Sequence, residues 1–539
     1  LYLVRAGRFA VTRTDEEGRP RLLGVIRPGE PAGEMALVAG TAHTADVVAL
    51  RDSEVLALSR EALFAAAERT PEVMTEIARR VIQRARGAAL GLPFNRPAVF
   101  GFVGLSPESD VRAWVEDVAA ALGRMGVHPE VVGAEALEAP TAWFTAVESR
   151  APCVLYVAEA SEPAWRSLCA RQVDRLFLVA SGGRRPRTER AGAPRSRSAA
   201  ADLVLLRPPG STIADSELWL DSEPAARLHH AEIGSRADAE RMARLLAGRS
   251  TALVLSGGGA RAYAHLGAIR ALREAGVPID RVAGTSMGAI IGASLASGLS
   301  DVEMEARIRR AFVDSSPLDD IALPLVAMTR GLKVADRLQD AFGERRIEDL
   351  PIPFTAVSAN LTTGRPQLHT RGRLAEALRA SASLPGVLPP VTENGQVLVD
   401  GAVMRNFPAD ILRAVHDGPI VGVDVTRSRG LTAEEVRRPE SLWRWFASGD
   451  WRRGPPIVAL LMSAAVAPAY REHAETLEAA DLLIAPDVAK VNIRDWKAFD
   501  PAVQAGYEAA RAALEALDRP VTELREAPAP ALASAAAPG

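Results

Sequence analysis

A serine between two glycines has the spacing that a nucleophilic turn requires. Gly284-Thr285-Ser286-Met287-Gly288 follows an apolar run at residues 279–283 and precedes a stretch of small residues with a helical pattern. A serine on a sharp turn between a strand and a helix projects its hydroxyl outward, and glycines at Gly284 and Gly288 avoid clashes with the neighbouring backbone. The five-residue pattern often arises by chance, but its place between a predicted strand and helix favours Ser286 as a nucleophile.

A glycine-rich turn lies one strand–helix unit earlier. Residues 252–255 are apolar, Gly257, Gly258 and Gly259 follow, and Arg261 opens a helical pattern. Uncovered backbone N–H groups at the start of a helix can stabilise a developing oxyanion. The alternative is a phosphate-binding loop, but that pattern needs Lys-Ser or Lys-Thr where this chain has Ala260-Arg261. The serine turn that follows favours an oxyanion hole.

A serine hydroxyl needs a base to accept its proton. The strand-like run 396–399 ends at Asp400, so this carboxylate could face Ser286 from a neighbouring strand. Such an aspartate would act as a base only in a water-poor site that raises its pKa. An ordinary Asp-Gly turn is the simpler interpretation. His265 or His369 could instead complete a Ser-His-Asp triad, although His265 lies on the helix after the glycine turn and is more typical of a packed residue.

Together these turns resemble the patatin-like phospholipases, and the residues between them are similar to the neuropathy target esterase branch of that family. The resemblance spans roughly residues 200–515 and rests on motifs in this order: Gly257-Gly258-Gly259-x-Arg261, Gly284-x-Ser286-x-Gly288, Arg345-Arg346-Ile347-Glu348-Asp349-Leu350, Arg379-Ala380-Ser381-Ala382-Ser383-Leu384-Pro385, Asp400-Gly401-Ala402 and Asn406-Phe407-Pro408-Ala409-Asp410. The chain departs from the branch at Ala402, where glycine is commoner, and at Arg405, where asparagine is expected.

The resemblance implies a Ser–Asp dyad, with Ser286 as the nucleophile and Asp400 as the base. It also implies an oxyanion hole made by the glycine loop with Arg261, no metal or cofactor, and a phospholipid or lysophospholipid substrate. The expected fold is multidomain, with a three-layer α/β patatin-like domain around a mostly parallel sheet at residues 249–519. The alternatives are a non-catalytic protein that binds lipid or a partner, and an acyltransferase.

Residues 1–90 alternate short strands and turns and then become helical. They resemble the β-roll cyclic nucleotide-binding domain, with its first strands expected before residue 1. In that family a glutamate contacts the ribose, and Glu34 matches it. An arginine contacts the cyclic phosphate, and His43 stands in its place. A neutral imidazole cannot replace the bidentate guanidinium, so we expect a docking or regulatory module that does not bind cyclic nucleotide.

The remaining segments complete the predicted organisation. We expect a linker at 91–97, a small α/β domain at 98–248 and a disordered tail at 520–539. The basic loop 184–197 is expected to be solvated, with contact to anionic lipid as the alternative. His229 and His230 lack a third ligand at suitable spacing and are expected to be structural. The apolar stretch 323–332 would cover the site, and 455–469 is predicted to be a buried helix or an acyl- or membrane-facing surface.

Composition limits the remaining function classes. The 539 residues carry a net charge of −3, which gives no reason to expect nucleic acid binding. Two cysteines, Cys153 and Cys169, give no disulfide framework and suit a reducing compartment. We therefore expect a cytoplasmic protein that contacts the membrane surface peripherally.

Overall fold

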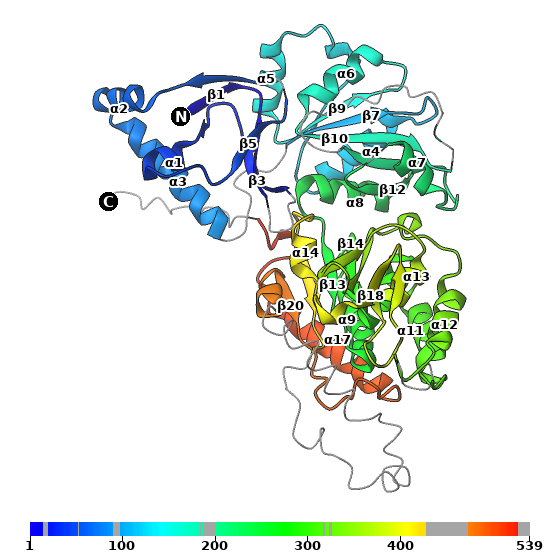
Figure 1. Cartoon of the computed structure of the whole chain (residues 1–539). Coiled ribbons are helices and arrows are strands. Elements are labelled where there is room, and N and C mark those ends of the chain that lie inside the picture. Colours follow the sequence, from blue (N-terminus) through cyan, green and yellow to red (C-terminus); the bar gives the residue numbers. More distant parts are fainter. Residues whose placement is uncertain are drawn as a thin grey trace, which may run out of the picture. The chain divides into compact units, whose positions relative to one another are not determined.

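The structure is a computed structural model that describes residues 1–14, 20–51, 53–89, 98–183, 186, 201–223, 225–315, 318–322, 326–426 and 473–526. The expected linker 91–97, the stretch 455–469 and all but one residue of the basic loop 184–197 lie outside these ranges. The chain divides into two compact units, Leu1–Gly248 and Arg249–Gly539 (Figure 1).

The first unit begins with two small antiparallel sheets, in the orders β4-β1-β6 and β3-β2-β5. Three helices accompany them, and α3 is amphipathic, with Ile77 in the core. The elements are β1 (Tyr2–Ala6), β2 (Phe9–Thr14), β3 (Pro20–Ile26), β4 (Pro31–Ala32), α1 (Glu34–Ala39), β5 (Asp46–Ala49), β6 (Glu54–Ala57), α2 (Arg60–Arg69) and α3 (Glu72–Ala89).

A parallel six-stranded sheet follows in the order β12-β11-β10-β7-β9-β8. Its strands are apolar on both faces because helices cover both: α4 and α8 pack on one face, and α5, α6 and α7 on the other. The strands are β7 (Val99–Gly104), β8 (Glu130–Val132), β9 (Val154–Ala158), β10 (Arg175–Ser181), β11 (Asp202–Arg207) and β12 (Leu228–Glu232). The helices are α4 (Val111–Arg124), η1 (Ala134–Ala136), α5 (Thr141–Arg150), α6 (Pro163–Gln172), α7 (Ser216–Ser222) and α8 (Arg236–Ala247).

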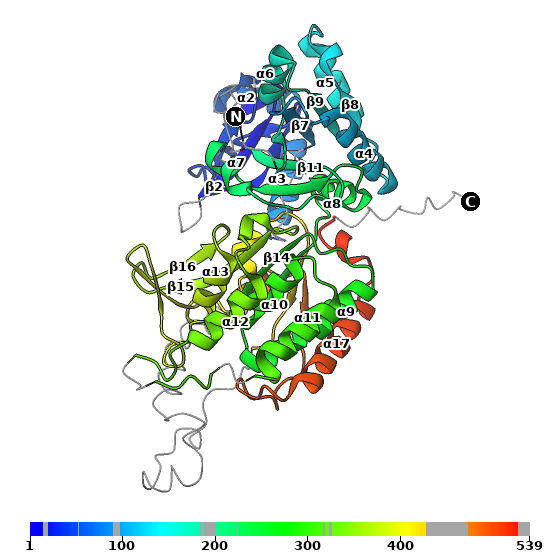
Figure 2. The ribbon, with the colours of Figure 1, turned by 90° about the vertical axis from the view of Figure 1, so that its right-hand side faces the viewer.

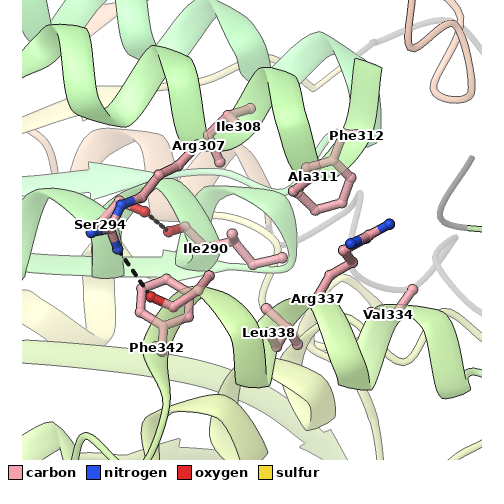
Figure 3. A pocket seen from close by; sticks show the side chains of 11 residues that line it. Ile290, Ser294, Arg307, Ile308, Ala311, Phe312, Val334, Arg337, Leu338 and Phe342 are labelled. Carbon is pink, nitrogen blue, oxygen red and sulfur yellow. Dashed lines mark hydrogen bonds between the residues drawn. The ribbon is translucent and has the colours of Figure 1, made fainter. Parts of the chain in front are cut away.

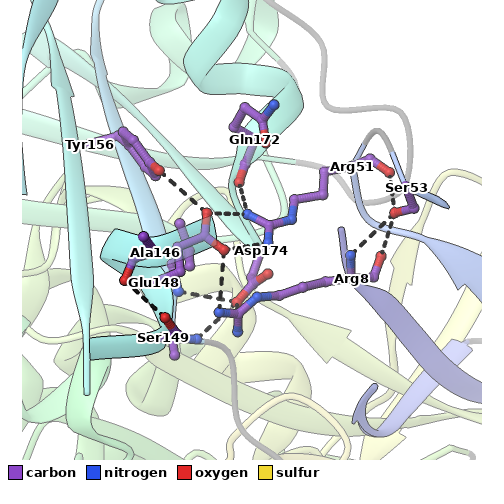
Figure 4. Close-up of polar contacts among 11 residues, drawn as sticks. Arg8, Arg51, Ser53, Ala146, Glu148, Ser149, Tyr156, Gln172 and Asp174 are labelled. Carbon is purple, nitrogen blue, oxygen red and sulfur yellow. Dashed lines mark hydrogen bonds and ion pairs between the residues drawn. The ribbon is translucent and has the colours of Figure 1, made fainter. Parts of the chain in front are cut away.

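A buried charge cluster joins these two parts of the first unit (Figure 4). It comprises Arg8 and Arg51 from the β-roll segment, and Glu148 and Asp174 from the α/β segment. Arg8 Nη1 donates to Asp174 Oδ2 at 3.0 Å, and Arg51 pairs through both terminal nitrogens with the Glu148 carboxylate. All four side chains are at most 5% exposed, so each charge depends on its partner and not on water.

The second unit holds an eight-stranded sheet in the order β17-β18-β15-β14-β13-β19-β20, with β16 also on β15. Strands β15, β14, β13, β19 and β20 pair in parallel, whereas β16 and β18 pair antiparallel with β15, and β17 pairs antiparallel with β18. The strands are β13 (Ala252–Leu255), β14 (Arg281–Thr285), β15 (Phe354–Asn360), β16 (Arg365–His369), β17 (Val391–Glu393), β18 (Gln396–Asp400), β19 (Ile420–Val423) and β20 (Leu482–Ile484).

Alternate residues of the central strands face opposite helical layers. On β13, Leu253 and Leu255 belong to the large core with α9, α10 and α17, whereas Ala252 and Val254 face the side of α14. The helices are η2 (Gly259–Tyr263), α9 (Ala264–Glu274), α10 (Met287–Ala296), α11 (Asp301–Ile308), π-helical η3 (Arg309–Val313), α12 (Leu332–Phe342), η4 (Ile347–Asp349), α13 (Leu374–Ser381), η5 (Gly401–Val403), α14 (Ala409–Arg413), α17 (Phe499–Glu515) and η7 (Val521–Glu523).

Helices α9 and α17 lie side by side (Figure 2). Their backbones can approach closely because Gly267 and Gly506 have no side chain, which at either position would overlap the backbone of the other helix. These layers confirm the predicted multidomain α/β fold.

The expectation of disorder from residue 520 is wrong for residues 520–526. Val521 lies in η7 and is 5% exposed, and Arg525 Nη1 is 3.3 Å from Asp481 Oδ1. Burial of one valine and an ion pair order a segment whose composition alone predicts a tail.

Candidate active site

Ser286 occupies a strained turn between β14 and α10. Its φ of 56° is unusual for a residue other than glycine, and such strain often marks a functional position. A side chain at Gly284 would come within 2.8 Å of the Gly288 backbone. A side chain at Gly288 would overlap Ser256 O. Both glycines are therefore needed for the turn that exposes Ser286 at the carboxyl end of β14.

Asp400 lies at the end of β18 and accepts a hydrogen bond from the Ser286 hydroxyl. Ser286 Oγ donates to Asp400 Oδ2 at 2.6 Å, and Ala402 N donates to Asp400 Oδ1 at 2.9 Å. Asp400 is 1% exposed. Burial raises its pKa to about 6 although the bonds from Ser286 and Ala402 act in the opposite direction. The carboxylate is thus a stronger base than an exposed aspartate and is already aligned with the hydroxyl.

The two histidines considered as alternative bases make other contacts. His265 is fully buried and its Nε2 lies 2.8 Å from Ser256 O. His369 Nε2 lies 2.8 Å from Ser358 Oγ. Burial lowers the pKa of both imidazoles to about 4. Neither contacts Ser286, so the geometry favours a dyad over a triad.

The glycine loop presents two backbone donors. The N–H groups of Gly258 and Gly259 have no acceptor among the described residues, whereas Gly257 N donates to Asn406 O at 3.2 Å. Gly259 has a φ of 56°, and a side chain there would overlap Ile493 O. Of the three glycines predicted for an oxyanion hole, the structure therefore leaves Gly258 and Gly259 as donors.

Arg261 holds the glycine loop through its backbone and its side chain. Its backbone N donates to Gly258 O at 3.2 Å, and its Nε donates to Val491 O at 2.8 Å. The guanidinium therefore anchors η2 to the segment before α17.

Ser381 and Ser383 hold the backbones of Ser286 and Asp400, a role that the sequence did not indicate. Ser381 Oγ accepts from Ser286 N at 2.9 Å and donates to Val357 O at 2.7 Å. Ser383 O accepts from Asp400 N at 2.9 Å. Both serines lie in the Arg379–Pro385 motif that carries the family resemblance. Position within that motif was the available signal, but it did not specify these contacts.

The two departures from the family pattern leave Asp400 unaffected. Ala402 contributes its backbone N–H, which any residue supplies. The Arg405 side chain lies 3.1 Å from Asp410, and its carbonyl accepts from Thr285 Oγ1 at 2.9 Å. Arg405 therefore steadies the nucleophile turn through its backbone.

A small apolar cavity lies beside α10 (Figure 3). Ile290, one turn after Ser286, and Phe312 from η3 line it together with Leu338 from α12. Arg307 Nη1 donates to Ala341 O at 3.0 Å and joins α11 to α12. The volume of the cavity is about 20 Å³, which is enough for one methyl- or water-sized group, so the cavity does not hold a whole acyl chain.

The two residues that match the nucleotide-binding positions of the β-roll have contacts within the protein. Glu34 is 1% exposed and pairs with Arg84 Nη1, while Arg84 Nη2 donates to Pro31 O at 3.0 Å. His43 is exposed, and its Cε1 lies 3.2 Å from the position of a side chain at Gly33. The carboxylate that matches the ribose ligand therefore already has a cationic partner.

Two further expectations concern metals and membranes. His229 Nε2 lies 3.4 Å from Asp202 Oδ2, and the described residues contain no group of three or more possible metal ligands. Within the same residues, no helix is both long enough and apolar enough to cross a bilayer.

Models of two protein families match separate segments of the chain. The patatin-like phospholipase model matches residues 253–413, and the cyclic nucleotide-binding domain model matches residues 1–70. An uncharacterized NTE family protein of Mycobacterium tuberculosis is 33% identical over 533 residues, covering 96% of this chain and 89% of that protein. These matches confirm the resemblance inferred from the motifs.

More distant relatives are longer proteins. Neuropathy target esterase sws of Drosophila melanogaster is 30% identical over 79% of this chain and 34% of its own length. Patatin-like phospholipase domain-containing protein 7 of Rattus norvegicus is 27% identical over 85% and 39%, respectively. Among solved structures, VipD from Legionella pneumophila covers 50% of this chain and 67% of its own, with 15% identity and a TM-score of 0.29.

Proposed function

This chain belongs to the NTE family, and we propose that it is a serine hydrolase that releases fatty acid from phospholipid or lysophospholipid esters. The observation that carries the proposal is the 2.6 Å bond from Ser286 Oγ to buried Asp400, beside the N–H groups of Gly258 and Gly259, which have no acceptor in the part of the chain that the structure describes. The names of the relatives, an esterase and a phospholipase-domain protein, support the same class of substrate.

The reaction proceeds in two halves. Ser286 Oγ attacks the ester carbonyl carbon while Asp400 accepts the hydroxyl proton, and the N–H groups of Gly258 and Gly259 bind the oxyanion. The protonated Asp400 then gives its proton to the leaving glyceryl oxygen, which leaves an acyl-enzyme. Water attacks this ester while Asp400 accepts its proton, and Asp400 then returns that proton to Ser286 Oγ as the bond to the acyl group breaks and the fatty acid leaves. Because these esters reside in membranes, we also propose peripheral contact of the protein with a lipid surface.

Release of fatty acid from lysophosphatidylcholine by the full chain, beside labelling with a fluorophosphonate, tests this function. We expect both release and labelling. Labelling without release, with the acyl group recovered on an added alcohol, would identify an acyltransferase. Neither labelling nor release, with binding to lipid vesicles retained, would indicate the non-catalytic lipid-binding alternative.

The rate should depend on pH through Asp400. Its pKa is raised to about 6, and only the ionised carboxylate accepts the serine proton. We expect kcat/KM to be full above this pKa and to fall tenfold per unit below it. Lysophosphatidylcholine does not titrate in this range because its phosphodiester is a strong acid and its quaternary amine has no proton to lose. A midpoint near about 4 would show an exposed, unperturbed carboxylate, and contradict the buried base.

We further propose that residues 1–89 do not bind cyclic nucleotides. Glu34 is paired with Arg84, and His43 offers no guanidinium for the cyclic phosphate. Calorimetric titration of the full chain with cyclic AMP and cyclic GMP is expected to show no binding heat. Micromolar binding of either nucleotide would overturn this proposal.

A further inference from the structure

The direction of each oxyanion donor depends on the carbonyl that precedes it. In a trans peptide, the C=O and the next N–H share one plane and point in opposite directions. The Gly258 N–H is therefore aimed by whatever holds Gly257 O, and the Gly259 N–H by whatever holds Gly258 O. Gly258 O accepts from Arg261 N within the loop itself, at 3.2 Å.

Gly257 is held from outside the loop by Asn406. Asn406 Nδ2 donates to Gly257 O at 3.2 Å, and Asn406 O accepts from Gly257 N at 3.2 Å. The peptide before Gly257 is also held, because His265 Nε2 lies 2.8 Å from Ser256 O, which can only accept. One side chain, 149 positions away in sequence, thus fixes the plane that carries the Gly258 N–H.

The orientation of the Asn406 amide is itself determined by its neighbours. Asn406 Nδ2 lies 2.8 Å from Thr426 Oγ1, and Thr426 Oγ1 donates its single proton to Asp424 Oδ1 at 2.5 Å. The threonine oxygen must therefore accept from Nδ2, as Gly257 O must. A flipped amide would place an oxygen against both acceptors.

Asp424 is anchored in turn by His473. His473 Nε2 lies 2.9 Å from Asp424 Oδ2, and the two side chains are 15% and 11% exposed. Burial acts to raise the pKa of Asp424, but the bonds from His473 and Thr426 outweigh it and lower the pKa. The carboxylate thus stays an acceptor, and the chain of contacts runs unbroken from His473 to the glycine loop.

We propose that Asn406 is a positioning residue that aims the Gly258 N–H at the oxyanion, with Thr426, Asp424 and His473 holding its amide in the required orientation. The proposal rests on the proposed hydrolase function. It predicts that a change at Thr426, which touches no member of the dyad, lowers transition-state stabilisation.

The test compares Asn406→Ala, Thr426→Val and Thr426→Ser in the full chain. Loss of a whole oxyanion donor costs roughly 100- to 1000-fold in kcat, so we expect a misaimed donor in Asn406→Ala to cost about 10- to 100-fold. We expect Thr426→Val to lower kcat about 3- to 10-fold, with KM changed by less than about twofold. Thr426→Ser restores the hydroxyl and is expected to recover the wild-type kcat.

A thionoester substrate separates positioning from a general structural effect. Its sulfur is a weak hydrogen-bond acceptor, so its hydrolysis gains little from the oxyanion donors. We expect the ratio of ester to thionoester rates to fall in Asn406→Ala and Thr426→Val, whereas Asp400→Asn slows both substrates alike. An unchanged ratio in Thr426→Val, with an unfolding midpoint equal to wild type, would overturn the proposal. Failure of the wild-type protein to hydrolyse the ester would instead overturn the proposed function.

Discussion

Replacing Ser286 with alanine, or Asp400 with asparagine, is expected to lower fatty-acid release by about four orders of magnitude or more. Alanine removes the atom that attacks the carbonyl. Asparagine keeps the shape of Asp400 but cannot accept the proton that Ser286 Oγ donates across 2.6 Å. Because the two groups act as one unit, the double variant should be no slower than the slower single variant.

The same variants distinguish a dyad from a triad. Fluorophosphonate labelling should vanish in Ser286→Ala and slow strongly in Asp400→Asn, since the asparagine no longer activates the nucleophile. His369→Gln should retain activity because His369 contacts Ser358 and not the nucleophile. Loss in His369→Gln with retention in Asp400→Asn would contradict the assignment.

Controls in the same experiment show that these losses are not caused by unfolding. Ser297 caps the end of α10, and among the described residues its hydroxyl bonds the Ala293 carbonyl and no group of the site, so Ser297→Ala should keep an activity near wild type. Asp400→Asn removes a buried charge whose pKa is raised by desolvation, so its unfolding midpoint should not be lower than that of wild type.

Sequence patterns singled out both members of the proposed dyad because each is marked locally. Ser286 lies between glycines that the turn requires, and Asp400 ends an apolar strand. Pairing of β15 with both β14 and β18 brings the two together, and a strand pattern does not specify that pairing. The prediction that Ser286 and Asp400 lie close together therefore came from the order of the family motifs and not from the local patterns.

The supporting contacts could not be predicted in the same way. Ser381 bonds the Ser286 backbone across 95 positions, and Asn406 bonds Gly257 across 149. Each contact depends on tertiary packing, and neither serine nor asparagine has a local pattern that reveals its partner. Similarly, Glu34 matched a ligand-binding position by sequence, but its pairing with Arg84 on α3 became visible only in the fold.

Removing one partner from the buried charge cluster should strongly destabilise the first unit. Asp174 Oδ2 accepts from Arg8 Nη1 at 3.0 Å (Figure 4). It also accepts from the backbone N of Ala98 and Val99. Replacing Asp174 with alanine leaves a buried guanidinium without its closest carboxylate and two amides without an acceptor. Removal of one partner from a buried pair typically costs about 3–5 kcal/mol, so we expect a loss of that size in the free energy of unfolding.

An exposed ion pair with the same N–O distance provides the matched control. Arg5 Nη1 lies 3.0 Å from Glu54 Oε1, and these side chains are 64% and 59% exposed. Water and salt screen this pair, so Glu54→Ala should cost less than about 1 kcal/mol. Hydrogen exchange of peptides from β7, β9 and β10 across a urea series measures both variants in the full chain. Equal effects for Asp174→Ala and Glu54→Ala would show that burial adds nothing to the cluster.

The Arg8→Met/Asp174→Ala double variant should recover part of the loss, because removing both charges leaves the unpaired amides of Ala98 and Val99 as the remaining cost.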